Sequence, residues 1–115
     1  MLAHARCPPL LIVSVDGVRV EWDDLHRQLT VQGRRLALRP QAYLFVRTLV
    51  AQAKAWEAGQ ADDRLVGHEA LCRETGAPSR HALHALASEV SQELGHCLLV
   101  INEYGQGYSM RGIVS

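Results

Sequence analysis

Hydrophobic and polar residues alternate along the first 40 positions with the two-residue period of half-buried β-strands. An apolar run from Leu10 to Val15 opens the pattern, and the turn pairs Asp16-Gly17 and Gln32-Gly33 interrupt it. The alternating apolar residues that follow the first run are Val18, Val20, Trp22, Leu29, Val31, Leu36 and Leu38. The pattern predicts a small antiparallel sheet before Pro40.

At Pro40 the spacing of apolar residues changes to three and four, which is typical of an amphipathic helix. Proline suits the first turn of a helix, where its missing N–H has no partner to lose. The apolar positions are Ala42, Phe45, Val46, Leu49, Ala53 and Trp56. We expect this helix to end near Gly59. We also expect Trp56 to lie in the core rather than on an exposed partner surface, because large aromatic side chains are highly buried on average.

Two shorter helices are predicted after a polar loop at 59–64. The first covers Val66 to Thr75, with Gly76 in the usual C-cap position. The second starts at Pro78 and ends at Gly95. Its expected buried stripe is Leu83, Leu86 or Ala87, Val90 and Leu94. Only Gly76 and Ala77 separate the two helices, which indicates a helix-turn-helix.

The segment from Cys97 to Met110 reads as a hairpin, because an apolar run, a turn at Gly105-Gln106-Gly107 and a second β-prone run follow one another. Sheet, three helices and hairpin in this order predict an α+β fold. The expected architecture is a winged helix-turn-helix with an N-terminal antiparallel sheet, a three-helix bundle and a C-terminal β-hairpin wing. Residues 1–9 are expected to form a flexible leader, and residues 10–115 a single winged-helix domain.

The chain resembles the effector domain of OmpR/PhoB-type response regulators over about residues 10–110. The similar segments are Val18 to Trp22 through Gln28 to Gly33, Leu36 to Pro40, Leu65-Val66 with Leu71, Val90 with Leu94, and the wing signature Gly105-x-Gly107-Tyr108. The resemblance implies a DNA-binding transcriptional regulator whose third helix, at about 78–94, reads the major groove. A chain of 115 residues leaves no room for a preceding receiver domain, so a stand-alone effector domain is expected.

Candidate DNA contacts follow from the polar residues of that helix and of the wing. They are Ser79, Arg80, His81, His84, Ser88, Tyr104 and Gln106. For Arg80 and His81 the opposing interpretation, solvated polar positions at a helix start, has equal weight. For His84 the solvated interpretation is favoured.

The charge distribution argues against DNA binding. The chain carries 12 basic and 12 acidic residues, and the stretch from Ala87 to Leu94 has two carboxylates and no cation. Between Val66 and Met110, two arginines stand against five glutamates, which removes much of the electrostatic part of DNA affinity. Arg34, Arg35 and Arg39 are interpreted as solubilising charges rather than as phosphate contacts. The alternative function is a winged-helix protein–protein interaction module that has lost DNA binding, with an exposed apolar patch near Trp56 or Tyr104.

Other function classes find little support. Three widely spaced cysteines and the lack of a long apolar run favour a cytoplasmic protein without membrane contact. His68 and Cys72 are four residues apart, but a bidentate pair is not a metal site, so neither metal nor cofactor is expected. No catalytic triad or nucleotide-binding loop is indicated, and the chain is interpreted as a non-enzyme. Double-stranded DNA is the expected partner, and a homodimer or a protein partner stays open.

Overall fold

The N-terminal sheet has four antiparallel strands in the order β1-β2-β3-β4, as the alternation predicts. The computed structural model describes residues 10–103 and 105–113, so the expected leader lies outside the described residues. The strands are β1 Leu10–Val15, β2 Val18–Asp23, β3 Gln28–Val31 and β4 Arg34–Leu36. The register pairs Val13 with Val20 and Val20 with Val31, so alternate apolar side chains gather on one face. Leu38 lies beyond the end of β4.

Three helices follow the sheet, and two of their boundaries differ from the prediction. The helices are α1 Pro40–Glu57, α2 His68–Thr75 and α3 Arg80–Leu94. The α2 helix starts two residues late because Val66–Gly67 form a short strand, β5. The α3 helix starts after Pro78 because Ser79 is its N-cap, and the Ser79 hydroxyl accepts a hydrogen bond from the Ala82 N–H at 3.2 Å. Gly76 caps α2 in the left-handed conformation at φ 79°, as expected.

The predicted wing is a hairpin of β6 Leu98–Glu103 and β7 Gly107–Gly112, joined by β5 in the order β5-β7-β6. Gly107 pairs with Gly67, and a Cβ on Gly107 would lie 2.0 Å from the Val66 carbonyl oxygen. The second glycine of the wing signature is therefore required by the close approach of two strands.

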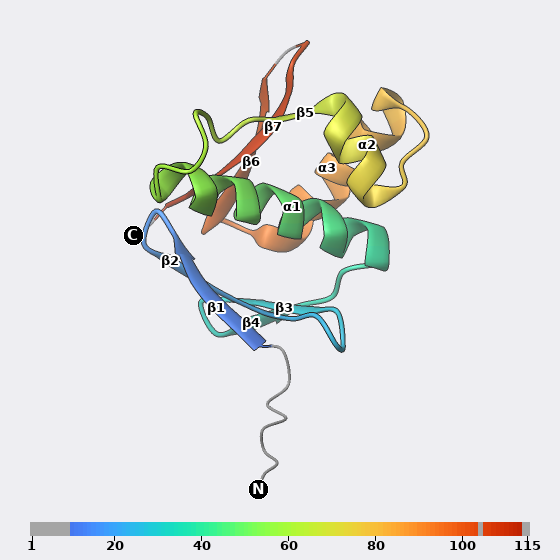
Figure 1. The fold of residues 1–115 in the computed structure, drawn as a ribbon. Coiled ribbons are helices and arrows are strands. Elements are labelled where there is room, and N and C mark those ends of the chain that lie inside the picture. The colour runs from blue at the N-terminus through green and yellow to red at the C-terminus, as the bar shows by residue number, and fades with distance from the viewer. Residues whose placement is uncertain (1–9, 104, 114–115) are drawn as a thin grey trace, which may run out of the picture.

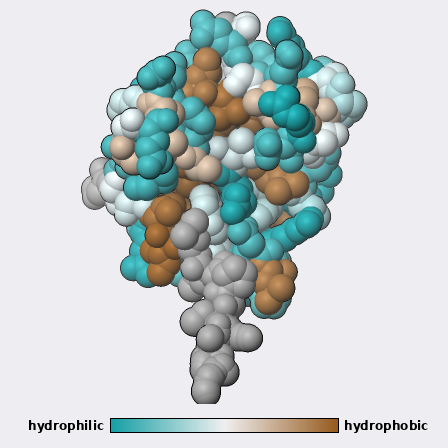
Figure 2. Space-filling model, viewed as in Figure 1, coloured by the Kyte–Doolittle hydropathy of each residue, from teal (hydrophilic) through white to brown (hydrophobic). Residues whose placement is uncertain are grey.

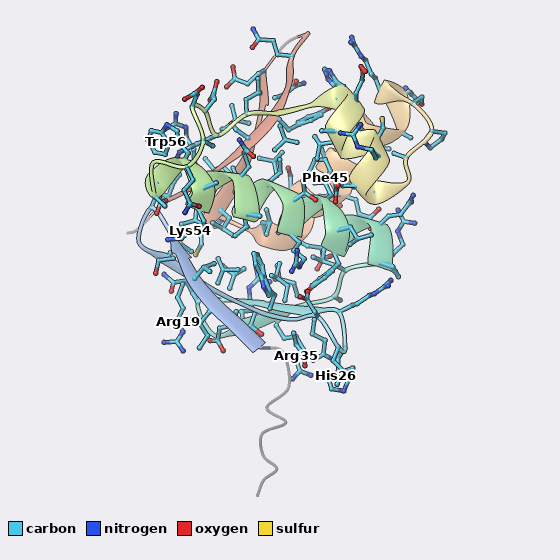
Figure 3. The ribbon with its side chains drawn as sticks, viewed as in Figure 1. Arg19, His26, Arg35, Phe45, Lys54 and Trp56 are labelled. Atoms are coloured by element: carbon cyan, nitrogen blue, oxygen red, sulfur yellow. The ribbon has the colours of Figure 1, made fainter. Side chains whose placement is uncertain are left out.

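The α1 helix lies between the N-terminal sheet and the group formed by α2, α3 and the wing (Figure 1). Its buried face carries Phe45, which is labelled in Figure 3. The Phe45 ring meets the Tyr108 ring of β7 edge to face, with the ring centroids 5.6 Å apart. The other buried residues of α1 are Ala42, Tyr43, Val46, Leu49, Val50 and Ala53. One helix thus supplies packing surface to both sheets.

The expectation that Trp56 lies in the core is wrong, since 42% of the residue is exposed. It lies in the last turn of α1, where the ring stacks on the Arg64 guanidinium, 4.4 Å from carbon to ring centroid. Arg64, at the end of the polar loop, is 6% exposed and donates to the Asp16 carboxylate and to the Met110 carbonyl. The indole therefore covers a buried arginine instead of entering the apolar core. Among the described residues, no helix is long and apolar enough to cross a membrane.

Candidate nucleic-acid interface

The side of α3 opposite its buried stripe is exposed and mostly polar. The buried stripe is Leu83, Leu86, Ala87, Val90 and Leu94, as predicted. The exposed residues are Arg80, His81, His84, Ala85, Ser88, Ser91 and Gln92. Because residues three, four and seven apart share a helix face, His81, His84 and Ser88 form one continuous stripe. The structure thus brings these three predicted contacts together.

The N-terminal end of α3 holds the other predicted contacts of this helix. The Ser79 hydroxyl serves as the helix cap, so one of its two acceptor lone pairs is already engaged. Arg80 is exposed and lies close enough to His68, the first residue of α2, to affect its titration. Burial and then the Arg80 charge lower the pKa of the His68 imidazole. The ring is therefore neutral at pH 7, and Arg80 supplies the positive charge at this end.

A groove separates the C-terminal half of α3 from the wing. Its lining contains no Asp, Glu, Lys or Arg, and it brings together two predicted contacts, His84 and Ser88, with Asn102 of β6, which the sequence interpretation missed. The remaining lining residues are Ala87, Ser91, Gln92, Val100 and Tyr108. Asn and Gln amides and Ser hydroxyls are side chains that hydrogen-bond base edges. The groove therefore presents hydrogen-bonding groups without a carboxylate that would repel phosphates.

Arg39, the residue before α1, forms an ion pair with one of the carboxylates of α3. The Arg39 guanidinium contacts Glu89 through Nε at 2.9 Å and through a terminal nitrogen at 2.6 Å. These hydrogen bonds lower the pKa of the Glu89 carboxyl and raise that of Arg39. Arg39 is thus an ion-pair partner of α3, which corrects its interpretation as a solubilising charge.

Arg34 of β4 binds the C-terminal end of α3. One of its terminal nitrogens donates to the carbonyl oxygens of Glu93 at 2.9 Å and Leu94 at 3.2 Å. A cation at the C-terminus satisfies open carbonyl groups and opposes the negative end of the helix dipole. Arg34 therefore fixes α3 to the N-terminal sheet, which also corrects its interpretation as a solubilising charge. Arg35 is exposed, as expected.

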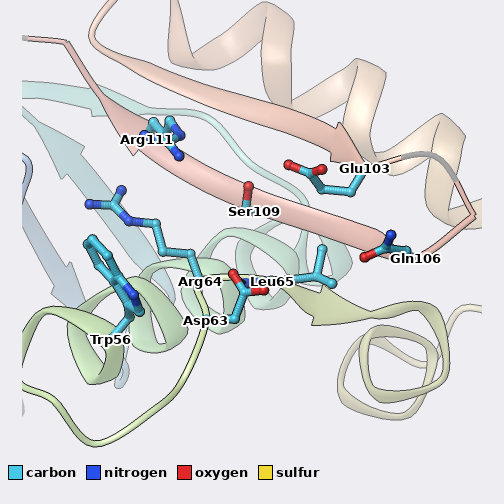
Figure 4. Close-up of a pocket in the computed structure, with 8 residues that line it drawn as sticks. All are labelled: Trp56, Asp63, Arg64, Leu65, Glu103, Gln106, Ser109 and Arg111. Atoms are coloured by element: carbon cyan, nitrogen blue, oxygen red, sulfur yellow. Dashed lines mark hydrogen bonds between the residues drawn. The ribbon is translucent and has the colours of Figure 1, made fainter.

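The predicted wing contact Gln106 lies away from this surface. Tyr104 lies outside the described residues. Gln106 is exposed, but it lines a pocket with Trp56, Arg64 and Arg111 rather than the groove beside α3 (Figure 4). The structure therefore does not join Gln106 to His84 and Ser88.

No group of three or more metal-binding side chains occurs among residues 10–103 and 105–113. Cys72 and Cys97 are partly buried free thiols. His68 instead meets the Tyr108 ring edge to face at 5.8 Å.

Comparison with known proteins gives a match in structure but not in sequence. No protein-family model matches the chain, and no curated protein matches it. The crystal structure of the DNA-binding domain of CpxR from E. coli is similar to it, with a TM-score of 0.63 and 19% sequence identity. The match covers 89% of this chain and 97% of that domain. CpxR is an OmpR/PhoB-family response regulator, and this chain shares the winged helix-turn-helix fold of its DNA-binding domain.

Proposed function

We propose that this protein is a DNA-binding transcriptional regulator that places α3 in the major groove. The observation that carries the proposal is the polar stripe of His81, His84 and Ser88 beside the groove between α3 and the wing. A helix that enters the major groove must present such a face, with hydrogen-bonding groups directed at base edges. The structural similarity to the DNA-binding domain of CpxR supports the proposal, although fold alone does not determine function.

The electrostatic objection from the sequence is reduced but not removed. The segment from Val66 to Met110 contains two arginines and five glutamates. In the folded protein two more arginines contact it, because Arg39 pairs with Glu89 and Arg34 binds the C-terminus of α3. The balance becomes four against five. We therefore propose weak, salt-sensitive binding by a single copy, with Arg80 as the main phosphate or guanine contact.

Replacing Arg80 by alanine tests this proposal. In fluorescence anisotropy with a mixed-sequence duplex, we expect binding that weakens as salt rises from about 20 mM to about 200 mM. The variant should bind more weakly, with a salt slope reduced by about one. Arg19→Ala is the matched control, because Arg19 lies on the N-terminal sheet, far from α3 (Figure 3). Loss of the same size in both variants would contradict a specific role for Arg80.

The Arg39–Glu89 ion pair gives a second prediction. Arg39→Ala leaves the Glu89 carboxylate free to repel phosphates, so the affinity for the duplex should fall about 3-fold at low salt. Adding Glu89→Gln in the same chain should restore the affinity, because the repelling charge is gone. If the double variant stays as weak as Arg39→Ala, Arg39 contacts DNA itself and does not act through Glu89.

A second function is supported by one observation, the exposure of Trp56. The interaction-module alternative predicts an exposed apolar patch near this residue, and Leu99 and Ile113 are also exposed, at 37% and 48%. Leu99 pairs with Arg111, which lines the same pocket as Trp56. A protein partner on this side of the wing would leave α3 free. Absence of duplex binding at the lowest salt would favour this function over DNA binding.

A further inference from the structure

The edge strand β1 presents unused backbone hydrogen-bonding groups. It pairs with β2 on one side, and no strand among the described residues pairs with its other side. The two-residue turn Asp16-Gly17 makes Val15 and Val18 a hydrogen-bonded pair. Such pairs alternate along an antiparallel ladder, so the N–H and C=O groups of Ile12 and Ser14 point away from β2.

The side chains of β1 do not protect this edge. Natural sheets usually guard an open edge with charged residues, proline or a bulge. β1 contains no charged residue and no proline, and Ile12 is 50% exposed. Figure 2 shows a hydrophobic strip in the region of β1, to the left of the grey N-terminal residues.

A groove runs beside β1, between this strand and the C-terminal half of α1. Its floor includes Val13, half-buried, and Trp22, whose indole N–H is buried without a hydrogen-bond partner among the described residues. The remaining lining residues are Arg47, Ala51, Lys54, Ala55, Ala58 and Gln60, and Figure 3 shows Lys54 extending toward β1. Small alanines on α1 leave room for side chains from an added strand.

An extended strand is the chemical complement of a free strand edge, and β1 is suited to pair with itself. Residues with outward-facing backbone groups recur at Leu10, Ile12 and Ser14, symmetrically about Ile12. A two-fold axis at Ile12 would therefore pair each Ile12 with its counterpart, and Leu10 with Ser14 of the second copy. The strand carries no charge, so no like charges meet across the axis, and the net charge of the whole chain is zero.

We propose that β1 binds β1 of a second copy of this chain in an antiparallel pair centred on Ile12. The two sheets of four strands then become one continuous sheet. The pairing satisfies the open backbone groups of both strands and buries the exposed Ile12 side chains against each other. It forms on the N-terminal sheet and leaves α3 uncovered, so it holds whether or not the protein binds DNA.

Sedimentation velocity of the full chain tests the proposal over a range from about 5 µM to about 500 µM. We expect the wild type to form dimers. Ile12→Arg places two cations face to face at the axis and should raise the dimer dissociation constant at least about 10-fold. Leu25→Arg is the matched control, because Leu25 is 66% exposed and lies outside β1, and it should leave the dimer intact. A wild type that stays monomeric throughout, or equal behaviour of the two variants, would overturn the proposal.

Disulfide trapping tests the register. With the three native cysteines replaced by serine, Ile12→Cys should give a covalent dimer on mild oxidation. Hydrogen-bonded antiparallel partners have Cα atoms about 5.5 Å apart, within disulfide range. Leu25→Cys should give little covalent dimer, and equal yields from the two variants would exclude pairing at Ile12. Circular dichroism checks that each variant is folded.

Discussion

Replacing Arg64 by alanine is expected to lower the free energy of unfolding by about 3 kcal/mol, because removal of one partner leaves a partly buried Asp16 carboxylate without its counterion. Arg64 joins three separate segments. Its guanidinium donates to Asp16 in the β1–β2 turn at 2.6 Å and to the Met110 carbonyl of β7 at 3.1 Å, and it stacks on Trp56.

Chemical denaturation with Arg111→Ala as the control measures the effect. Arg111 is exposed, so its removal should cost less than about 0.5 kcal/mol. Equal losses would show that Arg64 contributes no more than a surface cation.

The same ion pair predicts how stability depends on pH. Hydrogen bonds from Arg64 lower the pKa of Asp16 from 3.8 to about 2. A carboxyl group with a depressed folded-state pKa stabilises the fold above its unfolded-state pKa and loses this effect as pH falls. The difference in unfolding free energy between wild type and Arg64→Ala should therefore be constant above pH 5 and shrink between about pH 4 and pH 2. A difference that does not change over this range would mean that the Asp16 carboxylate gains nothing from Arg64.

Replacing Gly107 by alanine is the other substitution with a large expected effect on stability. The new Cβ would lie 2.0 Å from the Val66 carbonyl oxygen and 2.9 Å from the Gly67 Cα, so β5 and β7 must separate. Overpacking against backbone costs about 1–3 kcal/mol, and the lost strand pairing adds to it.

Gly105 offers the matched control for this substitution in the same turn. A Cβ there meets nothing within 4 Å, so Gly105→Ala costs only the strain of a left-handed backbone at φ 75°, about 1 kcal/mol. Thermal unfolding of both variants, followed by circular dichroism, should show the larger loss for Gly107→Ala. The reverse order would show that backbone conformation outweighs strand contact in the wing.

The sequence predicts the fold well where its signals are local. Period-two alternation and the turn glycines locate the strands, and the glycines at 76 and 95 mark where α2 and α3 end. β5 was missed because two residues carry no periodic signal, and its pairing partner Tyr108 is remote in the chain. The burial of Trp56 was predicted wrongly because helical spacing does not show that the ring stacks on Arg64 of the following loop instead of entering the core.

The candidate site was only partly predictable, for the same reason. Spacing along α3 correctly groups His81, His84 and Ser88 on an exposed face. The contacts of Arg39 with Glu89 and of Arg34 with the Glu93 carbonyl join residues 50 and 59 positions apart. Such pairs depend on how β4 and α1 are placed against α3, and a single sequence contains no signal for them. These two arginines add positive charge beside α3, and the proposed DNA binding depends on that charge.

Chemical-shift mapping by NMR, with the ¹⁵N-labelled protein and a mixed-sequence duplex at low salt, tests the central proposal most directly. We predict that the largest amide shifts occur at Arg80 and along the exposed stripe of α3, at His81, His84 and Ser88, with smaller shifts at Asn102 across the groove. The amides of β1 and of the Trp56 turn should stay unchanged. Shifts confined to the Trp56 side of the wing, or none at a duplex excess, would contradict the proposal that α3 reads DNA.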